Sequence, residues 1–391
     1  MIAPFRLAVT TLRLAHFRSY AQGALETGGA SVVLWGANGT GKTNLLEAVS
    51  LLVPGRGLRR AAPDEMVRRP DAPGWRVRAE VATQAGPVEI VTGVEGAQSA
   101  RRTVEIDGKA ATQTALGLHV RMVWLTPAMD RLWAEAPGER RRFLDRIALG
   151  FEPDHAEAAL AYEKAMRARN RLLREPRWDD AWLAGLEAQM ARAGARMARA
   201  RADALIRLTQ AQQALSEGRE TLFPRAKMTI LGQMESRFSE ALRAGDNLDS
   251  LEGVEAAALS RALEGARARD SAAGRALAGP HLSDLEAIYA AKDMQAGACS
   301  TGEQKALLIA LALANARALA EATGATPILL LDEVAAHLDA ARRRALFGEI
   351  EALGAQAWMT GNGAELFEGV AAGTLRLNVR EAGGRSTLEK G

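Results

Sequence analysis

The stretch SVVLWGANGTGKTNLLEAVS, residues 31–50, joins a short apolar run, a glycine-rich loop and a segment of helical composition. The loop matches the pattern G-x-x-x-x-G-K-[ST] at Gly36, Gly41, Lys42 and Thr43. Glycines let successive N–H groups turn toward phosphate oxygens, and the following helix offers its positive end to the same anion. Lys42 would reach the terminal phosphates, and the Thr43 hydroxyl would reach Mg²⁺. We therefore expect a phosphate-binding loop between a strand and a helix.

A second stretch, PILLLDEVAAHLD at residues 327–339, carries two carboxylates at the end of a buried-strand pattern. Such a strand suits a Mg²⁺ site, because it delivers oxygen ligands at its carboxyl end. Asp332 would hold the metal through water, and Glu333 would orient and deprotonate the attacking water. The expected catalytic residues are therefore Lys42, Asp332 and Glu333, and the expected metal ligands are Thr43 and Asp332.

Lys42 and Asp332 lie 290 positions apart, although one phosphate site needs them side by side. From about residue 127 to 278 the chain is rich in Ala, Arg, Leu and Glu, with few strand signals. Residues 154–175 read as one helix, Pro176 breaks it, and residues 178–220 read as a longer helix. We expect an α/β nucleotide-binding domain in two halves, 1–126 and 280–391, that flank an inserted α-helical arm, 127–279.

Composition narrows the class of protein. The chain has 391 residues, of which 48% are hydrophobic and 25% charged, with a formal charge of +3. The single cysteine, Cys299, excludes a disulfide framework within the chain and a cysteine-based metal site, and it favours a reducing compartment. The N-terminus lacks a signal-peptide core, and the longest apolar run, 306–316, is too short to span a bilayer. We expect a cytoplasmic protein with no membrane partner.

A third motif, STGEQ at residues 300–304, precedes an apolar helix. Ser300 is a candidate N-cap, and Glu303 would complete a capping box. On one interpretation, the motif is only a well-capped helix. The motif also resembles the signature of ABC-type ATPases, which lies shortly before the second acidic motif and faces the γ-phosphate of a nucleotide bound to another protomer. The two interpretations are compatible, because a helix N-terminus is also an anion site.

The order of loop, long helical insertion, signature, acidic strand and HLD is similar to that of SMC-like head domains. Within that class the chain resembles the RecF family of bacterial recombination mediators. The resemblance lies in LRLAHFRSY, GANGTGKTNLLEAV, TPAMDRLWAEAPGERRRFLDR, GPHLSDLEA and STGEQKALLIALALA. It implies an ABC-type P-loop ATPase head with a mixed sheet. The chain departs from the family at Leu282, usually Arg, and at Glu333, often Asp. It also lacks a switch histidine in AWMTGNG, where Thr360 is the nearest polar candidate.

The resemblance also implies an activity and its ligands. It implies a weak, DNA-stimulated ATPase that binds ATP and Mg²⁺ and dimerises on ATP, with hydrolysis in trans across the dimer. Nucleotide contacts would come from Gly36, Ala37, Asn38, Gly39, Thr40, Gly41, Lys42, Thr43, Asn44 and Arg18. The other protomer would contribute Ser300, Gly302, Glu303 and Asp339.

The implied partners are DNA and recombination proteins. The closed dimer would bind gapped DNA at single-strand/double-strand junctions, in the cytoplasm and associated with the nucleoid. With RecR and RecO it would promote RecA loading in repair and replication restart, and ATP hydrolysis would release the DNA.

Arginines gather just past the phosphate-loop helix, and they are the candidate DNA contacts: Arg56, Arg59, Arg60, Arg68 and Arg69. A guanidinium binds phosphate bidentately, and such contacts are independent of base sequence. The alternative is a solvated charged face. Aromatic residues are only 5% of the chain, which favours backbone contacts over base stacking. In a second group, 140–142, Arg141 could simply pair with Asp145 at i,i+4.

Two other functions stay open at this stage. In the first, ATP locks an SMC-like dimer that serves as a DNA or protein scaffold, and hydrolysis is incidental. The second is an ABC ATPase coupled to transport. The inserted helical segment and the lack of a membrane segment argue against transport.

Overall fold

The computed structural model describes residues 4–69, 72–96, 101–216 and 222–390. Its contacts divide the chain into two compact units. The sheet unit comprises Met1–Asp130, Ala214–Arg225 and Ser300–Gly391, and the helical unit comprises Arg131–Gln213 and Ala226–Cys299. The contacts thus group residues 280–299 with the helical unit, whereas the sequence assigns them to the second half of the nucleotide-binding domain. The domain boundaries at 127 and 280 stay a prediction.

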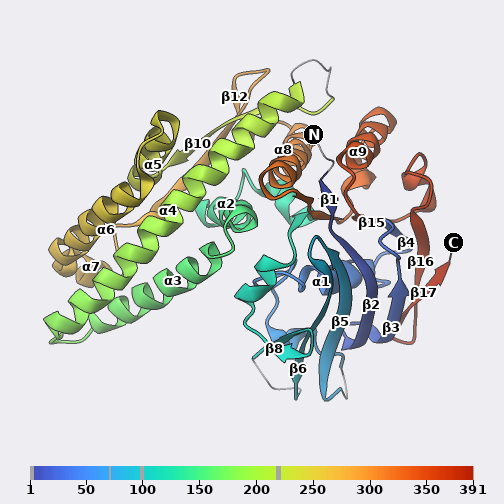
Figure 1. Cartoon of the computed structure of the whole chain (residues 1–391), viewed down its shortest axis with the longest axis horizontal. Helices are drawn as coiled ribbons and strands as arrows, with labels where there is room; N and C mark the ends of the chain where they lie inside the picture. The colour runs from blue at the N-terminus through green and yellow to red at the C-terminus, as the bar shows by residue number, and fades with distance from the viewer. Residues whose placement is uncertain (1–3, 70–71, 97–100, 217–221, 391) are drawn as a thin grey trace. The chain divides into compact units, whose positions relative to one another are not determined.

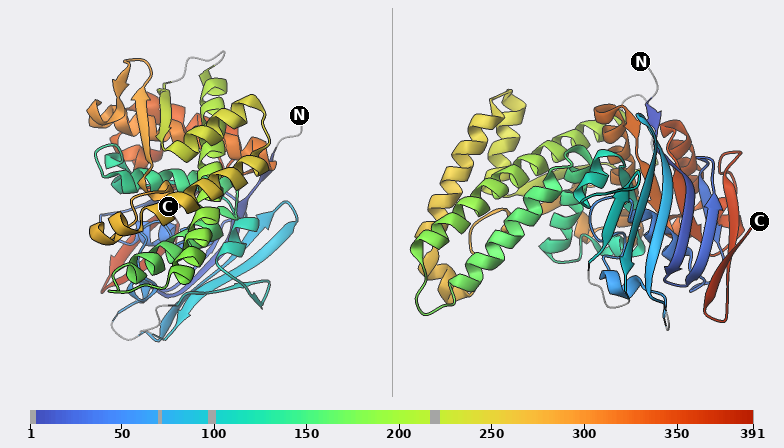
Figure 2. Two further views of the ribbon diagram at one scale, coloured as in Figure 1. Left: turned by 90° about the vertical axis from the view of Figure 1, so that its left-hand side faces the viewer. Right: turned by 60° about the horizontal axis from the view of Figure 1, so that its bottom comes forward.

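A largely parallel sheet forms the centre of the sheet unit, and strands from both ends of the chain build it (Figures 1 and 2). Its order is β17-β16-β4-β15-β14-β9, and only β17 runs antiparallel to its neighbour. The strands are β4 Val32–Trp35, β9 Met122–Leu125, β14 Ile328–Leu331, β15 Ala357–Gly361, β16 Leu375–Ala382 and β17 Arg385–Lys390. Runs such as VVLW and ILLL are apolar throughout because helices and a second sheet cover both faces.

Three helices belong to this sheet: α1 Lys42–Ser50, α8 Thr301–Thr323 and α9 Ala340–Leu353. Helix α8 packs against β9 and α9. It is long and apolar enough to cross a membrane by length and composition, yet 78% of its apolar window is buried inside the protein. The core helix of a soluble protein passes the same test, so α8 carries little evidence for a membrane.

An antiparallel sheet with the order β3-β2-β5-β6-β7-β8 completes the sheet unit. Its strands are β2 Ala8–Phe17, β3 Tyr20–Glu26, β5 Gly74–Thr83, β6 Gly86–Glu95, β7 Thr103–Ile106 and β8 Lys109–Ala110. Its inner face shares one core with β4, β15 and α1. A short pair, β1 Phe5–Arg6 and β13 Ala325–Thr326, joins the N-terminal segment to the C-terminal part of the chain.

The helical unit contains a long antiparallel pair of helices, α3 His155–Leu172 and α4 Asp180–Ser216. These confirm the two predicted helices, although the end of the second prediction lies outside the described residues. The unit also contains α2 Pro137–Phe151, α5 Gln233–Ala244, α6 Leu248–Gly265 and α7 Arg267–Ala273. The described residues also form 3₁₀ turns: η1 Pro63–Met66, η2 Thr114–Leu118, η3 Pro127–Arg131, η4 Pro280–Leu282, η5 Ala296–Ala298, η6 Val334–His337 and η7 Ala364–Phe367.

The helical unit also holds a small sheet, which the sequence prediction missed. Strand β10, Ala226–Leu231, pairs antiparallel with β11, Asp284–Tyr289, and β11 pairs with β12, Met294–Gln295. A second prediction is also wrong: Asp145 does not pair with Arg141. Its carboxylate accepts from Arg201 Nε at 2.7 Å, whereas Arg141 donates to the Ser283 carbonyl oxygen at 2.7 Å.

Candidate nucleotide site

The strand order brings the two sequence motifs to one edge of the parallel sheet. Strand β4 ends at Trp35 and runs into the glycine-rich loop, and β14 ends at Leu331 just before Asp332. Only β15 lies between them. Because these strands are parallel, their carboxyl ends share one edge, where open α/β sheets bind ligands. The topology therefore confirms that Lys42 and Asp332 lie in the same region.

Direct hydrogen bonds join the two motifs. The Thr43 hydroxyl donates to Asp332 Oδ1 at 2.9 Å, and the Thr360 hydroxyl donates to the same oxygen at 2.7 Å. Thr360 Oγ1 also accepts from the backbone N–H of Glu333 at 2.9 Å. Thr360, on β15, thus holds both acidic residues that follow β14, and it is itself buried.

Burial shifts the charges at this edge. Desolvation raises the pKa of the Asp332 carboxyl, although the two threonine hydroxyls oppose the shift by stabilising the anion. Burial lowers the pKa of Lys42, and the charges of Glu333 and Asp332 oppose that shift. The Lys42 cation and the Asp332 carboxylate, both buried, are therefore close enough to interact electrostatically.

The Lys42 ammonium group is held by the glycine-rich loop and by the residue that follows β15. It donates to the carbonyl oxygens of Gly36 at 2.7 Å and Ala37 at 2.8 Å, and to Asn362 Oδ1 at 3.4 Å. Asn362 directly follows β15 and is exposed. Sequence reasoning missed this residue, and the polar run TGNG after an apolar strand was the available signal.

The predicted site residue Glu333 has an unusual backbone conformation. Glu333 has φ 53° and ψ 21°, in the left-handed region that a side chain with Cβ seldom adopts. Its half-buried side chain follows Asp332 at the strand end. Such local strain is typical of residues that a site holds in place. In the loop itself, Ala37, Asn38 and Gly39 are exposed, whereas Thr40 is buried and its hydroxyl donates to the Ala37 carbonyl oxygen at 3.0 Å.

Arg18 and Asn44, two expected nucleotide contacts, belong to one polar cluster around Glu47 of α1. The Glu47 side chain is fully buried, and Arg18 binds both of its oxygens, at 2.9 and 2.8 Å. Arg59 reaches Glu47 at 3.4 Å and donates to Asn44 Oδ1 at 2.7 Å. The cluster therefore ties helix α1 to the β2–β3 turn and to the arginine-rich segment.

The signature motif begins helix α8, as predicted. Ser300 is the N-cap, and the capping box is present: the Ser300 N–H donates to Glu303 Oε2 at 3.0 Å, and the Glu303 N–H donates to Ser300 Oγ at 3.4 Å. Ser300 and Gly302 are exposed. Helix α8 runs antiparallel to the following strand β14, so its N-terminus lies toward the same edge as Asp332. Lys305, one turn later, pairs at 3.3 Å with Asp130, which follows β9.

Asp339 is exposed and caps helix α9. Its carboxylate accepts from the Arg342 N–H at 2.8 Å, and that bond lowers the pKa of Asp339. The cap is a local structural role, and it leaves the carboxylate at the surface.

The five candidate DNA arginines differ in their surroundings. Arg56 and Arg69 are exposed, and Arg60 is exposed with φ 56°. Arg59 is held by Asn44 and Glu47, as described above. Arg68 is half-buried and donates to the carbonyl oxygens of Ser19 at 3.0 Å and Gly384 at 2.7 Å.

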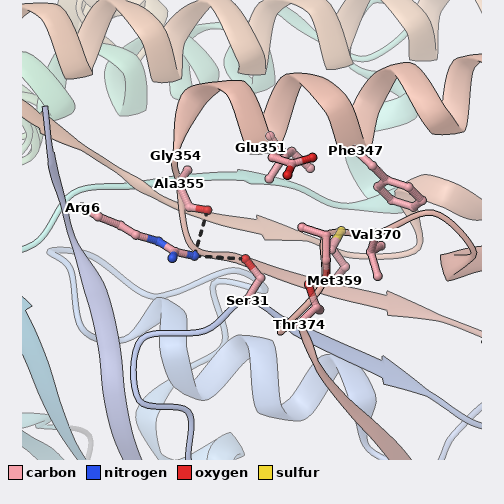
Figure 3. A pocket seen from close by; sticks show the side chains of 11 residues that line it. Arg6, Ser31, Phe347, Glu351, Gly354, Ala355, Met359, Val370 and Thr374 are labelled. Atoms are coloured by element: carbon pink, nitrogen blue, oxygen red, sulfur yellow. Dashed lines mark hydrogen bonds between the residues drawn. The ribbon is translucent and has the colours of Figure 1, made fainter. Parts of the chain in front are cut away.

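A cavity of about 140 Å³ opens at the opposite edge of the parallel sheet (Figure 3). Ser31, Ala355 and Thr374 lie just before β4, β15 and β16, at the amino ends of these strands. Arg6 donates to Ser31 Oγ at 3.4 Å and to the Ala355 carbonyl oxygen at 3.3 Å. No predicted site residue lines this cavity, so it is separate from the nucleotide-site candidate.

The fold and the joined motifs define a class of protein: a P-loop head of the SMC-like type with an inserted helical segment. Residues 8–379 match the family model described as the RecF/RecN/SMC N terminal domain. The chain is 48% identical over 367 residues to the DNA replication and repair protein RecF of Rhizobium leguminosarum bv. trifolii, covering 93% of this chain and 95% of that relative. It is also 48% identical over 400 residues to the RecF of Caulobacter vibrioides, covering 98% of each. The chain belongs to the RecF family of DNA replication and repair proteins.

Solved structures confirm the fold. The structure of the recombination mediator protein RecF-ATP in the RecFOR pathway has a TM-score of 0.79 and 22% identity, covering 99% of each chain. An SMC head bound to the C-winged helix domain of ScpA has a TM-score of 0.52 and 17% identity, covering 98% of this chain and 97% of that one. The predicted fold class and the predicted family are both confirmed.

Proposed function

We propose that the chain binds ATP with Mg²⁺ at the glycine-rich loop and hydrolyses it slowly. One observation carries this proposal: the Thr43 hydroxyl lies 2.9 Å from the Asp332 carboxylate, beside the buried Lys42, although the two motifs come from opposite ends of the chain. The RecF-ATP structure described above supports ATP as the ligand.

The donor set at the site fits Mg²⁺. A hydroxyl and a carboxylate are hard oxygen donors, which Mg²⁺ prefers together with phosphate oxygens and water. Thr43 and Asp332 would hold the ion, and the two hydroxyls on Asp332 Oδ1 keep that carboxylate oriented. When bound, Mg²⁺ would neutralise phosphate charge.

The other residues of this edge have proposed roles in hydrolysis. Lys42 would transfer its ammonium hydrogen bonds from the Gly36 and Ala37 carbonyl oxygens to phosphate oxygens. Glu333 would accept a proton from the attacking water, and Thr360 holds its backbone in place at 2.9 Å. Asn362, already within reach of Lys42, would lie near the terminal phosphate.

A second copy of the chain would complete the site. Ser300 and Gly302 are exposed at the start of α8, and Asp339 is exposed at the start of α9. The free N–H groups of a helix N-terminus attract anions. We propose that Ser300, Gly302 and Glu303 of one protomer approach the nucleotide on the other, with Asp339 at the seam of an ATP-dependent homodimer.

The proposed dimer binds DNA at the single-strand/double-strand junctions of gaps and, with RecR and RecO, promotes RecA loading in the cytoplasm. The family and the RecFOR relative support this role. Arg56, Arg60 and Arg69 are exposed and are the proposed backbone contacts. Hydrolysis would release the DNA, because the dimer without ATP would bind DNA more weakly than the ATP-bound dimer. A change of state alters DNA binding only through such a difference in affinity.

Replacement of Glu333 by Gln tests whether hydrolysis matters. The variant should still bind MgATP and gapped DNA, because the carboxamide keeps the shape of the side chain. It should release DNA more slowly and support fewer cycles of recombinase loading. If loading continues through repeated cycles at the wild-type rate, the nucleotide-gated scaffold is the better account and hydrolysis is incidental.

A further inference from the structure

Hydroxyl groups of two residues that are not part of the glycine-rich loop hold two of its peptide planes by hydrogen bonds. The Ser386 hydroxyl donates to the Thr40 carbonyl oxygen at 2.6 Å, and the Tyr20 phenol donates to the Gly41 carbonyl oxygen at 3.2 Å. In a trans peptide the carbonyl and the next N–H point in opposite directions. These two bonds therefore turn the N–H groups of Gly41 and Lys42 away from Ser386 and Tyr20.

Ser386 comes from the far end of the chain. It lies on β17, which forms a hairpin with β16 beside β4 (Figure 1). The Ser386 N–H donates to the Ser19 carbonyl oxygen at 3.0 Å, and Ser386 is 3% exposed. Arg68 bonds both this hairpin, at the Gly384 carbonyl oxygen, and the Ser19 carbonyl oxygen. The hairpin is thus anchored on both sides of the contact.

The hydroxyls form one directed chain. Asn44 Nδ2 donates to Ser19 Oγ at 2.8 Å, and Ser19 Oγ lies 2.6 Å from Ser386 Oγ. A hydroxyl has one proton, and the Thr40 carbonyl oxygen can only accept. The Ser386 proton therefore points to Thr40, and the Ser19 proton points to Ser386. Each bond in such a chain polarises the next, which strengthens the last one.

Gly41 shows how closely the hairpin meets the loop. It has φ 103°, and a Cβ at this position would lie 2.3 Å from Ser386 Oγ and 2.7 Å from Ser19 Oγ. The glycine is therefore required both by its backbone conformation and by the two hydroxyls against it. Tyr20 is fully buried, and burial raises the pKa of its phenol, so the phenol keeps its proton at neutral pH.

We propose that Ser386, together with Tyr20, is a positioning residue for nucleotide binding: the C-terminal hairpin orients the loop N–H groups that receive the phosphates of a nucleoside di- or triphosphate. This inference rests on the proposed nucleotide site. It adds to that site two residues that no loop motif contains, one of them more than three hundred positions away in sequence.

The test compares the binding of MgADP and MgATP, by isothermal titration calorimetry, among single variants of the full chain. Ser386→Ala should weaken both ligands roughly fivefold, since a neutral hydrogen bond contributes about 1 kcal/mol, and Tyr20→Phe, whose bond is longer at 3.2 Å, roughly threefold. Ser386→Cys, which retains a weak donor, should fall between Ser386→Ala and the wild type. Thr387→Ala is the matched control, because Thr387 is the next residue of the same strand and is exposed on the other face.

The readouts separate positioning from simple stability. The KM for ATP should rise in Ser386→Ala while kcat at saturating ATP stays within about twofold. Wild-type affinity in both Ser386→Ala and Tyr20→Phe, with only a lower melting temperature, would overturn the inference. If Ser386→Ala does not fold, the affinity of Tyr20→Phe for MgADP and MgATP alone tests the inference. If the wild-type chain itself binds no MgADP, the proposed nucleotide site is wrong and the inference is overturned with it.

Discussion

The buried carboxyl of Asp332 links the stability of the protein to the binding of a cation at the site. Burial raises the pKa of its carboxyl, so the folded protein favours the protonated form. A group of this kind stabilises the fold below its ordinary pKa, and that contribution is lost as the pH rises through the raised value. At neutral pH the buried anion therefore costs stability, which a bound cation would offset.

Asp332→Asn should raise the melting temperature of the protein by a few degrees in the absence of nucleotide, since each kcal/mol shifts it by roughly 2–4 °C in a chain of this size. The same change should abolish Mg²⁺-dependent ATP binding. Differential scanning calorimetry and titration with MgATP measure the two effects. Asp246→Asn, at an exposed position, is the control and should change neither. A lower melting temperature in Asp332→Asn would contradict the account.

Glu47 gives a second test at the residue scale. Arg18 binds both of its oxygens and is 21% exposed, whereas Arg59 reaches one oxygen at 3.4 Å and is 42% exposed. Arg18→Ala should therefore cost roughly 2–3 kcal/mol of unfolding free energy, and Arg59→Ala less than about 1 kcal/mol. Urea unfolding measures both. Equal costs would show that the two arginines share the carboxylate evenly.

The sequence motifs identify residues that are adjacent in the chain, but they do not identify the partners that the fold adds. Gly36, Lys42, Thr43 and Asp332 follow from the spacing of chemistry-bearing types. Asn362, Tyr20 and Ser386 reach the same loop only because strand order places β15, β3 and β17 beside it. The polar run TGNG was a local signal for Asn362, but nothing local in RSTLEK marks Ser386, since its role depends on register.

At the scale of elements, local signals were the most reliable. The capping box at Ser300 and the long helices of the helical unit depend on near neighbours, and the structure confirms them. Strand β10 was missed because its six residues pair with β11, more than fifty positions later. The pairing of Arg141 with Asp145 was wrong because a buried arginine on α4, Arg201, competes for the same carboxylate.

The capping box and the signature role of Ser300 can be separated. Ser300→Ala should cost about 1 kcal/mol of stability from the lost cap. Ser300→Asp should keep the cap, because aspartate is also a good N-cap residue, but would place a negative charge against the phosphates. If Ser300 faces the nucleotide of another protomer, both variants lose ATPase activity and only the first loses stability. Full activity in Ser300→Asp would limit Ser300 to the cap.

The helical unit depends on a buried ionic cluster. Arg201 is 2% exposed and pairs with Asp145 at 2.7 Å and Glu235 at 3.2 Å, and the neighbouring charges lower the pKa of Asp145. Arg201→Met should therefore destabilise the protein by about 3–5 kcal/mol, because two carboxylates lose the Arg201 guanidinium.

The lowered pKa of Asp145 also predicts a pH dependence. A carboxyl whose pKa is lowered by folding stabilises the folded protein at pH values above its ordinary pKa. The wild type should therefore lose stability as the pH falls below about 4. Unfolding curves between neutral and acid pH measure this loss.

At the scale of the whole molecule, the sheet unit is assembled from both ends of the chain. Strands β4 and β9 come from the N-terminal part, and β14, β15, β16 and β17 from the C-terminal part. The fold class could be predicted because two motifs of one site stood far apart with a helical segment between them. How a second copy completes the site lies beyond one chain, and it stays a proposal.

The rate of ATP hydrolysis per molecule, measured against protein concentration with and without gapped DNA, tests the central claim most directly. If the site needs Ser300 of a second protomer, the rate per molecule should rise as the protein passes from monomer to dimer, and gapped DNA should shift that rise to lower concentration. A rate per molecule that stays constant across the monomer–dimer transition would contradict the account.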